Sequence, residues 1–233
     1  MTKSRHSAVV MARRALTPRT LRVTLGGESL IGLASLPAQD VEIMVADGIG
    51  PPVKRRYTIR HARPESGEID LDVVLHEPGG AGSRWAERAQ LGSPVEFIGP
   101  CGKLELHPAD WHLFVGDETS LPAISALCEA LSEHEAATAV VQVTSDDDQM
   151  HIVCDDVRWV IQDEAPADGV DLLRAAVDDF ALTTSNGRAY LLGELQAVRI
   201  LCDGLAARGL ERDRIFAKSY WRARPALLHD VSA

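Results

Sequence analysis

The sequence has 233 residues, a net charge of −10 and 45% hydrophobic residues, enough for one large domain or two small ones with hydrophobic cores. An acidic chain is ill-suited to sequence-independent nucleic-acid binding, which needs a basic face to neutralise many phosphates. The sequence also has no run of about 18 apolar residues, so we expect neither a nucleic-acid partner nor a membrane span.

Charge divides the sequence into two unequal halves. Residues 1–110 carry 14 Lys and Arg against 13 Asp and Glu, whereas residues 111–233 carry 10 against 21. The two halves therefore have net charges near +1 and −11, as expected for two modules of different composition.

Short segments rich in apolar and β-branched residues make up the first module, separated by turn sequences such as TPRT, DGIGPP and PESGE. Six short strands without long helical crossovers predict a small antiparallel β-barrel. The expected strands are Ala8–Arg14, Leu21–Leu25, Val41–Val45, Arg56–Arg60, Ile69–Leu75 and Val95–Ile98. The segment GSRWAERAQL, residues 82–91, predicts one helix with Ser83 as its N-cap.

From Trp111 onward, apolar strands alternate with amphipathic helices. This alternation predicts a parallel sheet with helices on both faces and ligands at the carboxyl ends of the strands. The expected strands are 111–116, 137–145, 157–162, 188–194 and 214–220, and the expected helices are 120–134, 171–178 and 195–209.

A dense group of cations, KRRYTIR at residues 54–60, lies on the fourth expected strand. Because side chains alternate along a strand, Arg55 and Tyr57 share one face. A guanidinium there could hold a pyrophosphate while the phenol ring lies against a flavin, and Thr58 could meet the polar edge of that flavin. An exposed edge strand protected by charge would carry the same residues, so the motif alone leaves both interpretations open.

A glycine-rich turn follows the next strand, in VVLHEPGGAGSRWA at residues 73–86. Backbone N–H groups near Gly82 and Ser83, where a helix is expected to start, would suit a phosphate. Glycines and proline also form ordinary loops, so the position just after the cationic strand is what favours a flavin site.

The sequence FVGDETSLPAI, residues 114–124, occupies the place of a glycine-rich dinucleotide-binding turn. Asp117 and Glu118 would repel a bare pyrophosphate, so a conventional cradle is not expected there. Thr119, at a helix N-terminus, is expected to face the flavin across a cleft. The terminal KSYWRAR, residues 218–224, is either part of that site or the amphipathic end of a last strand.

Together RRYTIR, VVLHEPGGAGSRWA, FVGDETSLPAI, YLLGE and SYWR resemble the siderophore-interacting protein family in order and spacing. The members are FAD-dependent ferric-siderophore reductases related to the vibriobactin-utilisation protein. The resemblance implies a two-domain, ferredoxin-reductase-like fold. Residues 1–108 would form a six-stranded antiparallel barrel that binds FAD, and residues 109–233 an α/β domain that binds NAD(P)H and closes its C-terminal segment on the flavin.

The resemblance also implies a bacterial cytoplasmic enzyme that passes electrons from NADH or NADPH through FAD to a ferric siderophore. Electrons would pass through the flavin without a protein acid, base or metal ligand. The implied FAD contacts are Arg55, Tyr57, Thr58, Val74, His76, Gly82, Ser83, Asp117, Thr119 and Trp221, with Tyr220 beside the isoalloxazine. The implied NAD(P)H contacts are Glu118, Thr144, Gly193 and Glu194, and the implied siderophore contacts are Arg56, Lys218 and Arg222.

One residue departs from the family pattern, since Glu42 stands at or near a position where members often carry Lys. The acids of TSDDD, residues 144–148, favour a ribose hydroxyl over a 2′-phosphate and hence NADH, although a solvated loop would carry them equally well. Two other functions stay open: a flavin reductase that serves a redox protein, and a siderophore-binding protein that transfers no electrons. We expect a monomer, and the siderophore is not identified by the sequence.

Overall fold

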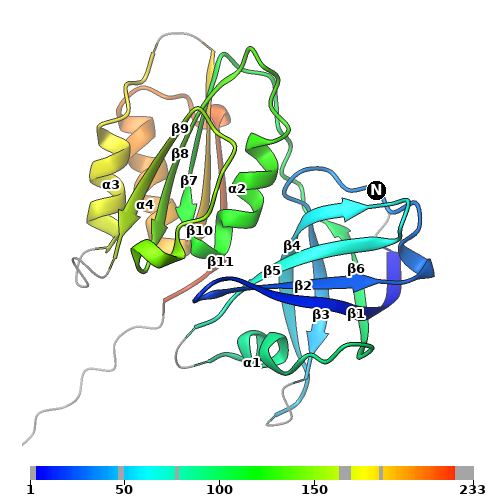
Figure 1. Cartoon of the computed structure of the whole chain (residues 1–233). Coiled ribbons are helices and arrows are strands. Elements are labelled where there is room, and N and C mark those ends of the chain that lie inside the picture. Colours follow the sequence, from blue (N-terminus) through cyan, green and yellow to red (C-terminus); the bar gives the residue numbers. More distant parts are fainter. Residues whose placement is uncertain (1–3, 47–49, 77–78, 163–168, 184–185, 224–233) are drawn as a thin grey trace, which may run out of the picture.

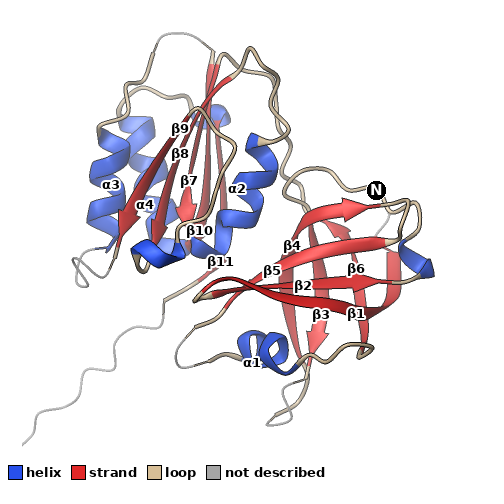
Figure 2. Ribbon diagram, viewed as in Figure 1, coloured by secondary structure: helices blue, strands red, loops and turns tan. Residues whose placement is uncertain are grey.

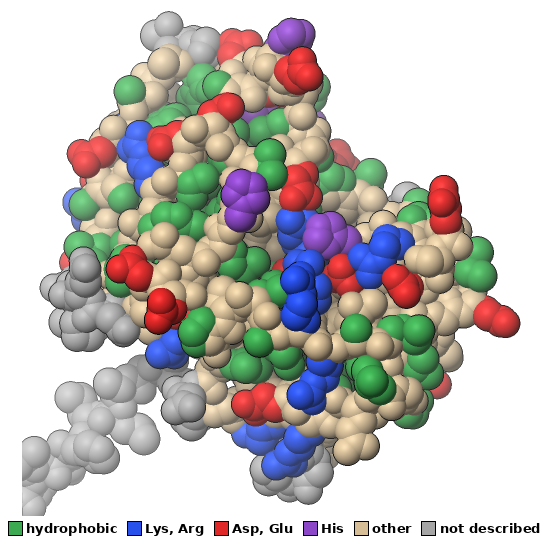
Figure 3. All heavy atoms as spheres, in the orientation of Figure 1, with side chains coloured by type: hydrophobic (Ala, Val, Ile, Leu, Met, Phe, Trp, Pro, Cys, Tyr) green, Lys and Arg blue, Asp and Glu red, His purple; other side chains and the backbone are tan. Residues whose placement is uncertain are grey.

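The computed structural model describes residues 4–46, 50–76, 79–162, 169–183 and 186–223. The first half of the chain forms a β-barrel and the second half an α/β sheet (Figures 1 and 2), which confirms the expected two-part architecture. On the face shown in Figure 3, Lys and Arg side chains lie mainly over the barrel, in keeping with the uneven charge of the two halves. Within the described residues, no helix is both long and apolar enough to cross a membrane.

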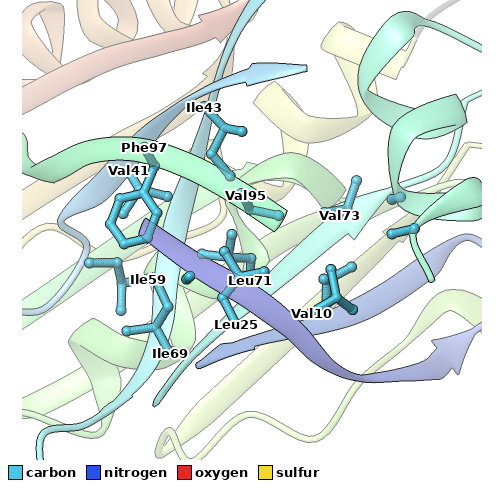
Figure 4. Packing of buried hydrophobic residues seen from close by; sticks show 14 of the residues in the cluster. Val10, Leu25, Val41, Ile43, Ile59, Ile69, Leu71, Val73, Val95 and Phe97 are labelled. Carbon is cyan, nitrogen blue, oxygen red and sulfur yellow. The ribbon is translucent and has the colours of Figure 1, made fainter. Parts of the chain in front are cut away.

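Six antiparallel strands close the barrel in the order β1-β2-β5-β4-β3-β6. Alternate side chains point inward, and Val41, Ile43, Ile59, Leu71 and Phe97 meet in a buried core (Figure 4). All six expected strands are present: β1 Ser4–Thr17, β2 Thr20–Gly26, β3 Asp40–Val45, β4 Val53–Arg63, β5 Glu68–Val74 and β6 Pro94–Cys101, with a 3-10 turn, η1, at Glu28–Leu30.

The helix after the glycine-rich turn, α1, spans Ala81–Arg88 and has Gly80 as its N-cap. The expectation that Ser83 caps this helix is therefore wrong, because Ser83 lies inside the first turn. Its buried hydroxyl instead bridges the end of β5, donating to the carbonyl of Val74 at 3.3 Å and accepting from the backbone N–H of His76 at 3.2 Å. Ser83 thus holds the turn between β5 and α1 in place.

The second half forms a five-stranded sheet in the order β11-β10-β7-β8-β9, in which every neighbouring pair is parallel. Helix α2 covers the face of the sheet that is nearer the barrel, and α3 and α4 cover the opposite face (Figure 1). The strands are β7 Trp111–Asp117, β8 Ala136–Val143, β9 Asp156–Ile161, β10 Gly187–Glu194 and β11 Ile215–Trp221. The helices are α2 Leu121–Cys128, α3 Gly169–Asp178 and α4 Leu195–Ala207, with 3-10 turns η2 Glu118–Ser120, η3 Asp146–Asp148 and η4 Arg212–Arg214.

Helix α2 is shorter than the expected helix over residues 120–134. The Glu135 carboxylate accepts hydrogen bonds from the backbone N–H groups of Ala109 and Ser132 and from the Ser132 hydroxyl, at 3.0, 3.1 and 2.9 Å. These bonds hold residues 132–135 in a turn. The apolar periodicity continues past Cys128, but the backbone bonds there tighten to i→i+3, from Ala130 to Leu127 and from Leu131 to Cys128, and the chain leaves the helix for this turn.

Several polar contacts between described residues join the two halves. Arg60 on β4 makes a bidentate bond to Glu129 after α2, at 2.8 and 2.5 Å. Lys218 on β11 bonds Asp40 on β3 at 3.0 Å. A third contact joins Thr17 and Asp148 at 3.2 Å, so the ends of the barrel strands face the α/β half.

Candidate functional site

Strand β4 presents its cations on two different faces. In register, Arg55 and Tyr57 lie opposite Ile43 and Val41, on the face that turns toward the barrel core and α1. The other face carries Lys54, Arg56 and Thr58, opposite Met44, Glu42 and Asp40. The expected pairing of Arg55 with Tyr57 on one face is confirmed, whereas Thr58 points to the other face.

Most cations of this strand already have acidic partners. Lys54 bonds Glu42 at 2.9 Å, Arg56 bonds Asp40 at 2.6 Å and Arg60 bonds Glu129. Among the described residues Arg55 has no such partner, and its guanidinium donates a hydrogen bond to the backbone carbonyl of Lys54 at 2.8 Å. An exposed guanidinium without a carboxylate is free to bind an anionic group.

Tyr57 and Gly82 are in close contact beside Arg55. The Tyr57 ring stacks on Trp85 of α1, with centroids 5.7 Å apart and planes 23° apart. A Cβ at Gly82 would lie 2.3 Å from the Tyr57 hydroxyl, so only glycine allows this approach. Burial raises the pKa of Tyr57 above its ordinary value, and the phenol stays neutral.

Asp117 organises the turn after β7. It is the N-cap of η2, and its carboxylate accepts from the backbone N–H and the hydroxyl of Thr119 at 2.9 and 2.5 Å. The Thr119 hydroxyl thus donates to Asp117, whereas the sequence predicts that Thr119 faces a flavin across a cleft. Burial raises the pKa of Asp117, and these hydrogen bonds act in the opposite direction.

The end of β10 is shaped around the same carboxylate. Gly193 has a φ of 131°, and a Cβ there would lie 2.5 Å from Asp117 Oδ2. The next residue, Glu194, donates its backbone N–H to that oxygen at 2.9 Å and caps α4 through its side chain, which accepts from Ala197 at 2.9 Å. Gly193 thus makes room for the buried carboxylate of Asp117, whereas the sequence predicts a contact between Gly193 and the nucleotide.

A cavity of about 660 Å³ opens at the carboxyl ends of the sheet strands, a size typical of cofactor sites. His76 from the barrel borders it, together with residues of the α/β half. The cavity collects eight of the predicted site residues: His76, Asp117, Glu118, Thr119, Thr144, Glu194, Trp221 and Arg222. Gln142, Gln162 and Gln196 also line it and were not predicted, although their positions at strand ends and at a helix start were a usable signal.

Acidic side chains outnumber basic ones around this cavity. Among the described lining residues, Asp117, Glu118 and Glu194 are the acids, and Arg222 is the one Lys or Arg. Glu118 accepts a short hydrogen bond from the backbone N–H of Thr144. Hydrogen bonds from backbone N–H groups outweigh burial at Glu194 and lower its pKa, so this carboxylate is ionised at neutral pH.

Asp148, the last of the acids after β8, is engaged by the protein itself. Asp148 is buried, and it accepts from the hydroxyls of Thr17 and Ser145 at 3.2 and 2.9 Å while Arg19 lies 3.5 Å away. Asp148 therefore joins the two halves of the chain. Of the acids in residues 144–148, Asp148 is therefore not available to bind a ribose hydroxyl.

The predicted siderophore contacts fall into two places. Arg56 and Lys218 converge on the buried Asp40, at 2.6 and 3.0 Å, and the Lys218 ammonium lies 4.9 Å from the centre of the Tyr220 ring. Arg222 instead borders the cavity. The structure thus unites two of the three residues in one charged cluster.

Two family models match the chain: the siderophore-interacting FAD-binding domain over residues 46–104 and the siderophore-interacting protein over residues 109–224. The ferric vibriobactin reductase ViuB of Vibrio cholerae is 31% identical over 90% of this chain and 86% of its own length. The chain belongs to the siderophore-interacting protein family.

Other similar proteins extend the comparison. The NADPH-dependent ferric-chelate reductase of Escherichia coli is 28% identical over 87% of each chain. The crystal structure of a siderophore utilization protein from T. fusca superposes with a TM-score of 0.85 and 27% identity, covering 96% of this chain and 95% of that one.

The barrel fits the cofactor that its family model names. FAD needs a cation for its pyrophosphate and a flat surface for its ring system, and the barrel offers the unpaired Arg55 and the stacked Tyr57. The close packing of Gly82 against Tyr57 brings the start of α1 directly beside them. This chain is an FAD-dependent oxidoreductase of the family.

Proposed function

We propose that the protein uses NAD(P)H to reduce a ferric siderophore and so releases ferrous iron inside a bacterial cell. The observation that carries this proposal is the shared cavity. His76, just after β5 of the barrel, borders the same space as Asp117, Glu194 and Trp221 of the α/β half. An electron donor held at the sheet ends would there meet a flavin held by the barrel.

The proposed roles follow from the chemistry of each group. Bound FAD accepts a hydride and passes the electrons on singly, and the ferrous ion is held more weakly than the ferric ion by hard oxygen ligands. Arg55 neutralises the cofactor pyrophosphate, Tyr57 supports the ring system, and the turn held by Ser83 brings the start of α1 close to both. Residues 1–108 carry the FAD site and residues 109–233 the donor site.

The donor is proposed to be NADH. A 2′-phosphate needs cationic partners, and Arg222 stands among three carboxylates in the cavity. The relative from Escherichia coli bears the name of an NADPH-dependent enzyme, so the two donors must be compared directly. A kcat/KM for NADPH that equals or exceeds the value for NADH would overturn this choice.

The siderophore is proposed to bind beside the cluster of Asp40, Glu42, Lys54, Arg56 and Lys218. Two carboxylates there already pair with three cations, so the cluster offers little uncompensated positive charge. Ferric chelates of low net charge, such as hydroxamates, should be preferred over strongly anionic ones. A strongly anionic chelate needs unpaired cations to attract it, and the carboxylates of the cluster would repel it.

The test is the anaerobic visible spectrum of the purified protein, before and after NADH and then with a ferric hydroxamate and a ferrous trap. We expect a flavin spectrum that bleaches with NADH and returns as the ferrous complex forms. Bleaching without any ferrous product, with fast transfer to a redox protein, would favour an electron-transfer module. Protein that stays colourless with added FAD would indicate a siderophore-binding protein that transfers no electrons. We further propose a cytoplasmic monomer, which fractionation and light scattering would test.

A further inference from the structure

One carboxylate holds three chain segments at the cavity. Besides the two bonds from Thr119, Asp117 accepts at its Oδ2 atom from the backbone N–H of Glu194 at 2.9 Å and from the indole Nε1 of Trp221 at 2.8 Å. The ends of β7, β10 and β11 therefore meet at this one side chain.

The backbone is adapted to this meeting. The pairing of β10 with β11 shifts by one residue at the point of contact, since Gly193 lies opposite Ser219 but Glu194 lies opposite Trp221. Such a shift re-aims a side chain at a strand end. Together with the absence of a Cβ at Gly193, it lets the indole reach Asp117.

Trp221 is partly exposed at this junction. Its side chain borders the cavity, and the residue is 45% exposed. Its neighbour Ala223 donates a backbone N–H to Glu194 Oε1 at 3.1 Å. For a ring that is nearly half exposed, the polar bond is a main determinant of orientation, and a bond to a carboxylate is among the stronger ones available.

We propose that Asp117 is a positioning residue: by accepting the Trp221 hydrogen bond it fixes the indole at the junction of the two halves and sets the surface against which the nicotinamide end of the donor binds. The inference rests on the proposed function, because it takes the cavity to be the donor site. A surface that is already ordered binds its ligand at a smaller entropic cost than a mobile one.

The test compares Trp221→Phe, which keeps a ring but removes the Nε1 donor, with Trp159→Phe as the matched control. Trp159 lies half-buried on β9, away from this carboxylate. In Trp221→Phe we expect the KM for NADH to rise by about fivefold to tenfold with little change in kcat, and we expect no change in Trp159→Phe. An unchanged or lower KM in Trp221→Phe would overturn the proposal.

Asp117→Asn, made alone and together with Trp221→Phe, separates positioning from general stability. If Asp117 acts through the indole, its effect on KM is largely lost in the Trp221→Phe background, whereas independent effects multiply. The second readout needs no cofactor: ¹⁹F NMR of protein labelled with 5-fluorotryptophan should show the Trp221 resonance shifting in Asp117→Asn. A resonance that does not move would contradict the proposal. A wild-type protein whose flavin NADH does not reduce would instead contradict the proposed function.

Discussion

Replacing Gly82 by Ala tests the flavin site through one contact. An added Cβ would lie 2.3 Å from Tyr57 Oη, 3.5 Å from its Cζ and 3.7 Å from Arg55 Cγ. The Tyr57 ring is confined by its stacking on Trp85, so it must shift at a cost. Overpacking of this kind costs about 1–3 kcal/mol, which corresponds to a rise of about fivefold to 150-fold in the Kd for FAD if the displaced ring is a flavin contact.

Calorimetric titration of flavin-free protein with FAD measures this Kd, and thermal unfolding reports the stability. Tyr57→Phe offers a rescue, because without the hydroxyl the nearest Tyr57 atom lies at an ordinary contact distance of 3.5 Å. Gly82→Ala with Tyr57→Phe should therefore bind FAD about as tightly as Tyr57→Phe alone. Gly80→Ala is the control, since a Cβ there meets nothing within 4 Å. Wild-type affinity in Gly82→Ala, or an equal loss in Gly80→Ala, would refute the reasoning.

Three further predictions concern charge. Arg55→Ala should raise the Kd for FAD about tenfold or more, since a charged hydrogen bond contributes about 1.5–3 kcal/mol. Lys54→Ala, the control, should leave this Kd nearly unchanged. Equal losses of FAD affinity in titrations of the two variants would contradict the assignment of Arg55. Glu42→Lys should raise kcat/KM for a trianionic ferric chelate relative to a neutral one, and an unchanged ratio in steady-state assays would argue against the proposed substrate cluster. Burial acts to raise the pKa of Asp70, but the bonds from Arg63 and Thr24 outweigh it and lower that pKa below its ordinary 3.8. Its stabilising effect is therefore present above pH 3.8 and is lost as the pH falls below that value, so Asp70→Asn should flatten the acid limb of the unfolding free energy measured with urea.

The strands and the two-part architecture could be predicted because their signals are local. Alternation within segments such as Val41–Val45 marks one buried face, and the repeated order of strand and helix after Trp111 is compatible with few folds. The shared face of Arg55 and Tyr57 follows from the same alternation. The limits of α1 and α2 were predicted less well, because Ser83 and Glu135 make short-range bonds that apolar periodicity does not report.

The sequence by itself thus determined the barrel, the parallel sheet and the positions of the motifs along the chain. Only the tertiary structure decided which charges remain free. Asp40 meets Lys218 although 178 positions separate them, and Asp117 meets Trp221 across 104. Whether a cation binds a ligand or an internal carboxylate depends on such distant neighbours, because charges interact through space, and their spacing is set by how the two halves pack together.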